Sequence, residues 1–150
     1  MREIRTEIDI VASATCVWQA LTDFELYPEW NPFIRRVSGQ CIDGGELRVT
    51  TASLFGILLN FQLKVDNILE NRGMRWLGQT LMAGLLDGHH YFEIHEMSPE
   101  KVRFIQYEEF SGCMLPLAWP MIAPLSRKGF DSMNKALKKK VEQDVSKASK

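Results

Sequence analysis

Three polar side chains in the second half of the sequence could carry chemistry: His90 and Glu108 as acid or base, and Gln106 as a hydrogen-bonding group. His90 alternates with Phe92 along one predicted strand, and Gln106 and Glu108 alternate with Phe104 along the next. Because successive side chains of a strand point to opposite faces, these polar groups share the face of their apolar neighbours. A buried imidazole or carboxylate needs a partner. The three groups therefore satisfy one another in the core, meet a polar group on a ligand, or lie in solvent if the register shifts by one residue.

Other kinds of chemistry have no signature in the chain. His89 and His90 are adjacent, so in a strand they point to opposite faces, and no third ligand stands at a suitable spacing from them and His95. We therefore predict no metal site and no cofactor. The sequence also lacks a nucleophile elbow, a phosphate-binding loop and a dinucleotide fingerprint. Glu108 and His90 remain as candidates for a general acid or base.

Length and composition predict one globular domain over residues 1–150, because 45% of the 150 residues are hydrophobic and 25% are charged. The net charge of −1 offers no field that would attract nucleic acid. The apolar runs are far shorter than the ~20 residues that span a membrane. Three widely spaced cysteines without a CxxC pair are expected to be reduced thiols. We therefore expect a cytoplasmic protein.

Hydrophobic periodicity predicts a strand at the start of the chain, a short helix capped by Ser13, six further strands and a long C-terminal helix. The polar residues 144–150 are expected to fray. The first strand covers Ile4 to Ile10, and the helical period begins at about Met121. The other strands are predicted at about residues 33–42, 47–53, 59–69, 74–80, 89–97 and 102–110.

The connections between these six strands are too short for parallel pairing, which needs long crossovers. We therefore predict an antiparallel meander whose apolar face is covered by the C-terminal helix, an α+β architecture. Between the first helix and the second strand, Tyr27-Pro28 and Asn31-Pro32 predict two interruptions of regular secondary structure, or stops. Trp30 lies between the two stops and is expected outside any regular element, wedged into a cavity or into the core around it.

Three segments carry a resemblance to a known family. The chain resembles the polyketide cyclase/dehydrase branch of the START-like (SRPBCC) superfamily in Asp23-Phe24 with Trp30-Asn31-Pro32-Phe33-Ile34, in Gly88-His89-His90-Tyr91-Phe92-Glu93, and in Glu108-Glu109-Phe110-Ser111-Gly112. The resemblance implies the helix-grip fold: about seven curved strands wrapped around the long helix, with two short helices between the first two strands. It also implies an internal cavity for an apolar ligand, in a family that includes lipid carriers and cyclases.

The connections predicted at the two ends of the meander differ in character. Polar turns at residues 43–46, 70–73 and 98–101 must share one end, because alternate turns of a meander fall at opposite ends. The other end collects apolar segments, although loops are normally polar. These segments cap the core, or they form a hydrophobic portal, and the two roles are compatible. Such a portal would admit a lipid-like molecule or dock transiently on a membrane or a protein partner. They are residues 30–33, 54–58, 81–86 and 112–120.

The leading interpretation is a binding or carrier domain for a small hydrophobic molecule, lipid-like or polyketide-like. One alternative is a cyclase, dehydratase or hydrolase that uses Glu108 or His90 as its acid or base. Another is an accessory protein that docks through its apolar loops. The predicted ligand-binding residues are Trp30, Phe33, Phe61, Trp76, His90, Phe92, Gln106, Glu108 and Trp119.

Overall fold

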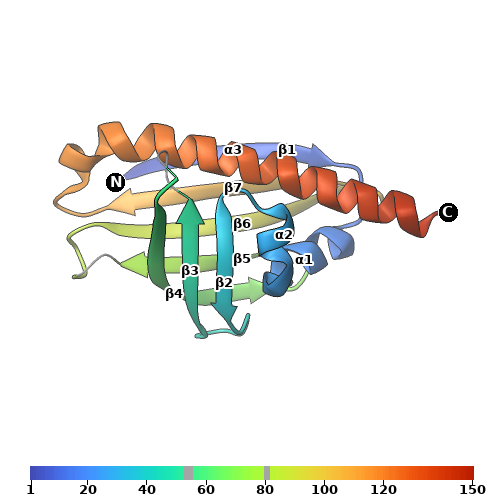
Figure 1. Cartoon of the computed structure of the whole chain (residues 1–150), viewed down its shortest axis with the longest axis horizontal. Helices are drawn as coiled ribbons and strands as arrows, with labels where there is room; N and C mark the ends of the chain where they lie inside the picture. Colours follow the sequence, from blue (N-terminus) through green and yellow to red (C-terminus); the bar gives the residue numbers. More distant parts are fainter. Residues whose placement is uncertain (53–55, 80–81) are drawn as a thin grey trace.

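A computed structural model of the chain describes residues 1–52, 56–79 and 82–150. In this part of the chain an antiparallel sheet of seven strands, in the order β1-β7-β6-β5-β4-β3-β2, curves around one long helix (Figure 1). This confirms the predicted helix-grip α+β fold. The elements are β1 (Arg2–Ile10), α1 (Ala14–Thr22), the 3-10 helix η1 (Phe24–Leu26), α2 (Tyr27–Trp30), β2 (Ile34–Gly39), β3 (Glu46–Ala52), β4 (Leu58–Leu69), β5 (Gly73–Gln79), β6 (Asp87–Ser98), β7 (Lys101–Ser111) and α3 (Leu115–Ala148).

The short helices between β1 and β2 follow the local sequence signals with one difference. Ser13 caps α1 as predicted, because its hydroxyl accepts a hydrogen bond from the backbone N–H of Cys16. The prediction that Trp30 lies outside any regular element is wrong, since Trp30 ends the single-turn helix α2. Pro28 stands in the first turn of this helix, where a missing N–H has no intrahelical partner to lose.

Helix α3 begins earlier than the hydrophobic period indicates. Its first residue is Leu115 rather than about Met121, although Pro120 and Pro124 lie inside it. Packing supports these first turns: Leu115 is buried, and Trp119 packs edge-on against Phe110 with ring centroids 5.9 Å apart. At its other end the helix continues to Ala148, past the point where fraying is expected.

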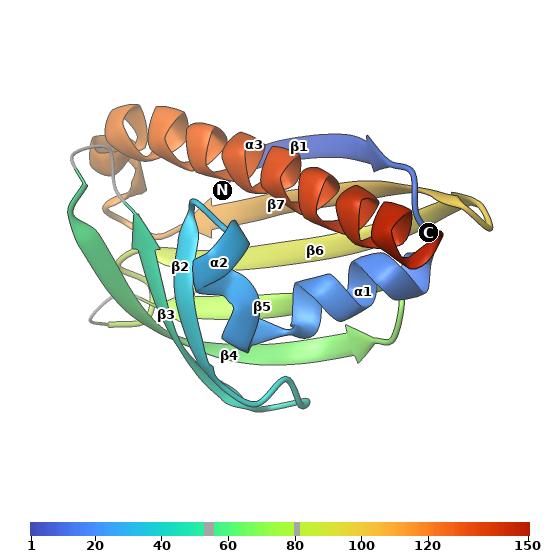
Figure 2. The ribbon, with the colours of Figure 1, turned by 45° about the vertical axis from the view of Figure 1, so that its right-hand side comes forward.

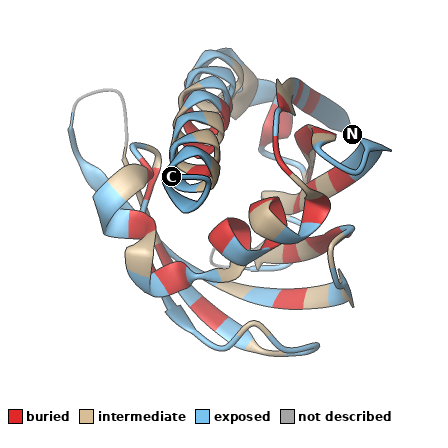
Figure 3. Cartoon of the chain, turned by 90° about the vertical axis from the view of Figure 1, so that its right-hand side faces the viewer, coloured by how far each residue is buried: buried red, intermediate tan, exposed pale blue. Residues whose placement is uncertain are grey.

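The core lies between the curved sheet and the helices, on the inward surfaces marked as buried in Figure 3. Along β6 the buried residues are His90, Phe92 and Ile94, which confirms the predicted face of this strand. Helix α3 supplies Met133, Leu137 and Val141 to the same core. The sheet and α3 thus hold the polar candidates among apolar side chains.

Successive connections of the meander lie at opposite ends of the sheet, as its parity predicts (Figure 2). At the end where α3 begins, the backbone N–H groups of Cys113 and Met114 donate to the carbonyls of Gly84 and Leu85. The β5–β6 connection and the β7–α3 connection therefore lie side by side. Residues 54, 55 and 81 of the predicted apolar segments lie outside the described residues.

Candidate ligand-binding cavity

A cavity of about 330 Å³ lies between the first turns of α3 and the inner face of the sheet. Strands β2 to β7 all contribute side chains to its wall. A cavity of this size is at the lower end of the range for small-molecule sites. Its lining is mainly apolar, and includes Val49, Phe61, Trp76, Phe110, Ile122 and Leu125.

The cavity opens toward the apolar end of the sheet. The inward-facing residues of β4 become more exposed in that direction, from 0% at Val65 to 36% at Phe61 and 40% at Leu59. An inward face that becomes exposed is not covered by other side chains, so the core is left open here. Exposed apolar side chains continue around this end in Ile57, Leu58, Met82, Met114, Leu117 and Met121. Exposed apolar patches of this kind mark contact sites on proteins.

Phe33 is fixed in the cavity wall by the turn that precedes it. The buried Asn31 accepts hydrogen bonds at Oδ1 from the backbone N–H of Phe33, at 3.0 Å, and of Ile34, at 2.8 Å. The Phe33 ring then packs edge-on to Phe130 and against Gly129 of α3, where any larger side chain would collide with the ring. The aromatic turn thus joins the sheet to the long helix at the cavity.

The polar part of the wall is the pair formed by His90 and Glu108. These residues are cross-strand neighbours on β6 and β7, and His90 Nδ1 lies 3.4 Å from Glu108 Oε2. Only 11% of the His90 side chain and 20% of the Glu108 side chain are exposed. Gly88 makes room for the carboxylate, because a Cβ at Gly88 would collide with Glu108 Oε1. The His90 ring stacks on Phe92 at a centroid distance of 4.4 Å.

A buried chain of hydrogen bonds continues from His90 away from the cavity. His90 Nε2 lies 3.0 Å from Gln106 Oε1. Gln106 Nε2 donates to the backbone carbonyl of Phe130, at 3.1 Å, and to Asn134 Oδ1. Asn134 Nδ2 donates to Thr6 Oγ1 at 3.0 Å. The inward polar groups therefore satisfy one another in part, while Glu108 at the cavity has only His90 as a partner in the described part of the chain.

The structure brings five of the nine predicted ligand-binding residues to the cavity wall: Phe33, Phe61, Trp76, His90 and Glu108. Phe92 and Gln106 are fully buried beside the wall and contact His90. Trp30 and Trp119 lie elsewhere: Trp30 packs against Tyr27, and Trp119 packs between Phe110 and the guanidinium of Arg2.

The sequence analysis did not identify three residues that support the His90–Glu108 pair: Thr6, Gly88 and Asn134. A signal for Asn134 was available, because this polar residue stands one helical turn from Phe130 and from Leu137, within the buried stripe of α3. Thr6 alternates with Ile4 and Ile8 on β1 and so had to face inward. Gly88 could be recognised only from its contact with Glu108 in three dimensions.

Two buried polar atoms of cavity-lining residues have no hydrogen-bond partner among the described residues. They are Nε1 of Trp76 and Oδ1 of Asp87. A buried donor or acceptor without a partner costs roughly 1–3 kcal/mol.

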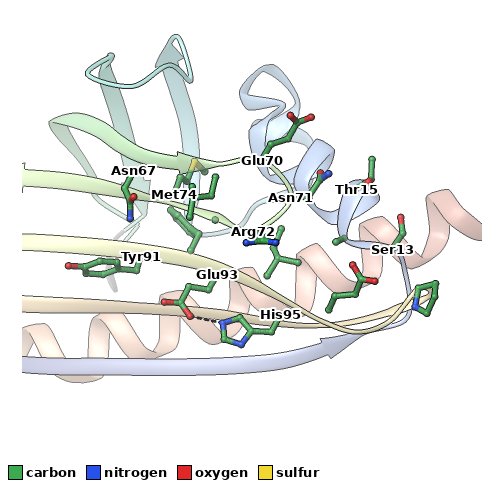
Figure 4. Close-up of a pocket in the computed structure, with 17 residues that line it drawn as sticks. Ser13, Thr15, Asn67, Glu70, Asn71, Arg72, Met74, Tyr91, Glu93 and His95 are labelled. Atoms are coloured by element: carbon green, nitrogen blue, oxygen red, sulfur yellow. Dashed lines mark hydrogen bonds and ion pairs between the residues drawn. The ribbon is translucent and has the colours of Figure 1, made fainter.

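A second and larger hollow, of about 780 Å³, lies at the polar-turn end of the sheet (Figure 4). Its Glu93 carboxylate has partners within the protein: His95 Nε2 lies 2.8 Å from Glu93 Oε2, and the hydroxyl of Tyr107, which is outside the lining, donates to Glu93 Oε1 at 2.9 Å. Burial, together with this hydrogen bond, raises the pKa of Tyr107 above its ordinary value. The Glu93 carboxylate is thus engaged on both oxygens within the protein.

In the described ranges, no three side chains of His, Cys, Asp or Glu gather closely enough to hold a metal ion. Within the same ranges, none of the helices has the length and apolar composition needed to cross a bilayer.

Comparison with known families decides the relationship of the chain. Residues 1–142 match the family described as polyketide cyclase/dehydrase and lipid transport. The chain belongs to this family. Among curated proteins, no relative matches the sequence.

Solved structures give the same fold for this polyketide cyclase/dehydrase and lipid transport family member. A START superfamily protein from Mycobacterium smegmatis superimposes with a TM-score of 0.75 at 23% identity, covering 94% of this chain and 97% of the other. The Zhui aromatase/cyclase from a Streptomyces species has a TM-score of 0.79 at 15% identity, with 96% and 95% covered. A norcoclaurine synthase point mutant from Thalictrum flavum has a TM-score of 0.73 at 13% identity, with 95% of each chain covered. At these identities the likeness establishes the fold alone.

Proposed function

We propose that this protein binds a small hydrophobic molecule in the cavity beneath α3 and acts as a binding or carrier protein for it. The observation that supports this most directly is the open, apolar cavity next to a ring of exposed apolar side chains. Solvent exposure of Leu59 and Phe61 on the inward face of β4 is unfavourable unless something covers them. A bound apolar molecule would cover them.

The size of the cavity sets the affinity that we expect. A ligand that buries about 300 Å² of apolar surface gains roughly 7–8 kcal/mol. This corresponds to about micromolar affinity before the loss of ligand motion is subtracted. Simple apolar probes should therefore bind at micromolar or higher concentrations, and the physiological ligand should gain further affinity from the polar groups of the wall.

The second candidate function is an enzyme, and the position of the His90–Glu108 pair favours it. Both side chains line the cavity, and a carboxylate beside an imidazole can move a proton to or from a bound molecule. An enzyme of this kind would act mainly by holding a reactive chain in position. Membership in a family that includes cyclases is compatible with this candidate, and so is the aromatase/cyclase activity of the Streptomyces neighbour.

The carrier function is tested with the neutral probe N-phenyl-1-naphthylamine, whose fluorescence rises in apolar surroundings. Phe61→Glu should weaken probe binding at least about tenfold, because it places a charge at the apolar wall. Phe61 is partly exposed, so the fold should tolerate the change. Gln62→Glu, at the adjacent exposed position that points to the other face of β4, is the matched control and should bind as the wild type does.

Native mass spectrometry of the purified protein, followed by solvent extraction, should identify any molecule that co-purifies. Absence of probe binding to the wild-type protein, or equal binding by both variants, would contradict the proposed function. An enzyme would be indicated instead if Glu108→Gln kept the binding of the extracted molecule but abolished its conversion.

A further inference from the structure

The hydrogen-bond chain behind the cavity sets the position of the proton on His90. The backbone carbonyl of Phe130 can only accept, so the Gln106 amide atom that faces it at 3.1 Å must be the nitrogen. The other amide atom, Oε1, therefore faces His90 Nε2 at 3.0 Å as an acceptor. His90 must then donate from Nε2, and its neutral ring carries no proton on Nδ1.

The other hydrogen bonds behind the cavity are consistent with this assignment of the Gln106 amide. The Thr6 hydroxyl donates to the backbone carbonyl of Gln106 at 3.3 Å, so Thr6 Oγ1 is free to accept from Asn134 Nδ2. Asn134 Oδ1 then accepts from Gln106 Nε2. Each of these three side chains is buried, so none can change its orientation by exchanging a partner with solvent.

On the cavity side, this assignment leaves two acceptors facing each other. The Nδ1 lone pair of the neutral ring lies 3.4 Å from Glu108 Oε2. The described residues provide no other side-chain or backbone donor to the Glu108 carboxylate. Neither acceptor can satisfy the other. A ligand that carries a donor can supply a proton to the pair.

We propose that the chain Thr6–Asn134–Gln106 fixes His90 as the Nε2–H tautomer, so that Nδ1 and the Glu108 carboxylate form an acceptor pair that binds the hydroxyl group of an apolar ligand. This inference rests on the proposed function and specifies the ligand as an alcohol, phenol or enol. A ketone offers no proton to the pair, and a carboxylate would face Glu108 with like charge.

A matched series of small aromatics tests the selectivity: 2-naphthol, 2-methoxynaphthalene and 2-methylnaphthalene. The wild-type protein should bind 2-naphthol at least about tenfold more tightly than either analogue, because only the naphthol has a proton to donate. Glu108→Met should lose the preference for the naphthol over the two analogues. Glu109→Met, the neighbouring change on the other face of β7, should keep the preference.

The outcomes separate this inference from the proposed function. If none of the three compounds binds the wild-type protein, the proposed function fails and the inference with it. If all three bind with equal affinity, the proposed function stands and the hydroxyl site is refuted. Retention of the preference in Glu108→Met also refutes it.

The tautomer is measured directly by long-range ¹⁵N–¹H correlation spectra of the imidazole rings in the complex with 2-naphthol. His90 should give the Nε2–H pattern, and its signal is assigned by its loss in His90→Gln. Gln106→Met removes the acceptor and should weaken the tautomer preference, while the matched Gln62→Met on the outer face should not change it. A His90 ring that carries its proton on Nδ1, or on both nitrogens, in the wild-type complex would overturn the proposal, whether or not Gln106→Met folds.

Discussion

The two hollows of this protein differ in what their polar groups do. The hollow at the polar-turn end is larger, about 780 Å³ against about 330 Å³, but its Glu93 carboxylate already binds His95 and Tyr107. The smaller cavity keeps Trp76 Nε1 and Asp87 Oδ1 without partners in the described part of the chain. The two hollows therefore differ in whether the polar atoms of their lining residues already have partners.

Strand β6 contributes its first residues to the apolar cavity and its later residues to the polar hollow. His90 faces the apolar cavity, while Tyr91, Glu93 and His95 line the polar hollow (Figure 4). Hydrogen bonds behind the cavity are buried, whereas those at the polar hollow are partly exposed. Removing a bond should therefore cost more stability on the cavity side.

Asn134→Ala should produce the largest effect. It leaves an amide proton of Gln106 without an acceptor in the core and should lower the free energy of unfolding by about 2 kcal/mol, which corresponds to a fall in Tm of roughly 4–8 °C. Tyr107→Phe removes one partly exposed hydrogen bond to Glu93 and should lower the free energy of unfolding by about 0.5–1 kcal/mol. Chemical denaturation of both variants measures the difference. Equal losses of unfolding free energy would show that the buried hydrogen bonds of Asn134 contribute no more to stability than the partly exposed bond from Tyr107 to Glu93.

A pair of Thr→Trp variants compares ligand binding in the two hollows. Thr51 lines the cavity, so Thr51→Trp should fill part of it and weaken the binding of N-phenyl-1-naphthylamine by at least about tenfold, or ~1.4 kcal/mol. Thr15 lines the polar hollow, so Thr15→Trp should leave the affinity unchanged. Fluorescence titration gives both values. A loss of affinity in Thr15→Trp would move the probe site to the other hollow.

The smallest effect concerns the ion pair between Asp66 and Arg75 on the outer face of β4 and β5. The hydrogen bonds from Arg75 lower the pKa of Asp66 below its ordinary value of 3.8. The stabilisation is therefore present above that ordinary value and is lost as the pH falls through the lower pKa of the folded state. Because the pair is partly exposed, its contribution should stay below about 1 kcal/mol.

Asp66→Asn should accordingly reduce the pH dependence of the free energy of unfolding below pH ~4, where the carboxylate is titrated. Urea denaturation of wild type and variant across this range gives the comparison. An unchanged pH dependence would show that the unfolded chain binds the proton no more strongly than the folded chain does.

Much of the fold follows from local patterns in the sequence. The alternation around His90 and Gln106 places both groups inward, and the structure confirms this. The start of α3 could not be predicted, because Pro120 and Pro124 normally end a helix and only the packing of Leu115 and Trp119 overrides that preference.

The candidate site was predictable only in part. Residue types and alternation were enough to select His90 and Glu108, but their partners come from elements far away in the sequence. Thr6 lies on β1 and Asn134 on α3, and their contact spans 128 positions of the chain. The side chains behind His90 thus come from β7, α3 and β1, so no local pattern brings them together.

The three prolines of α3 leave its first turns with fewer backbone hydrogen bonds than the rest of the helix. Pro116, Pro120 and Pro124 are spaced by four residues, so the two later ones each remove the backbone hydrogen bond that would reach back to the preceding proline. Unwinding of this segment, which carries Ala118, Met121 and Ile122 of the cavity wall, therefore breaks fewer bonds than unwinding an equal length further along. When these turns loosen, Leu137 and Val141 keep the remainder of α3 attached to the core.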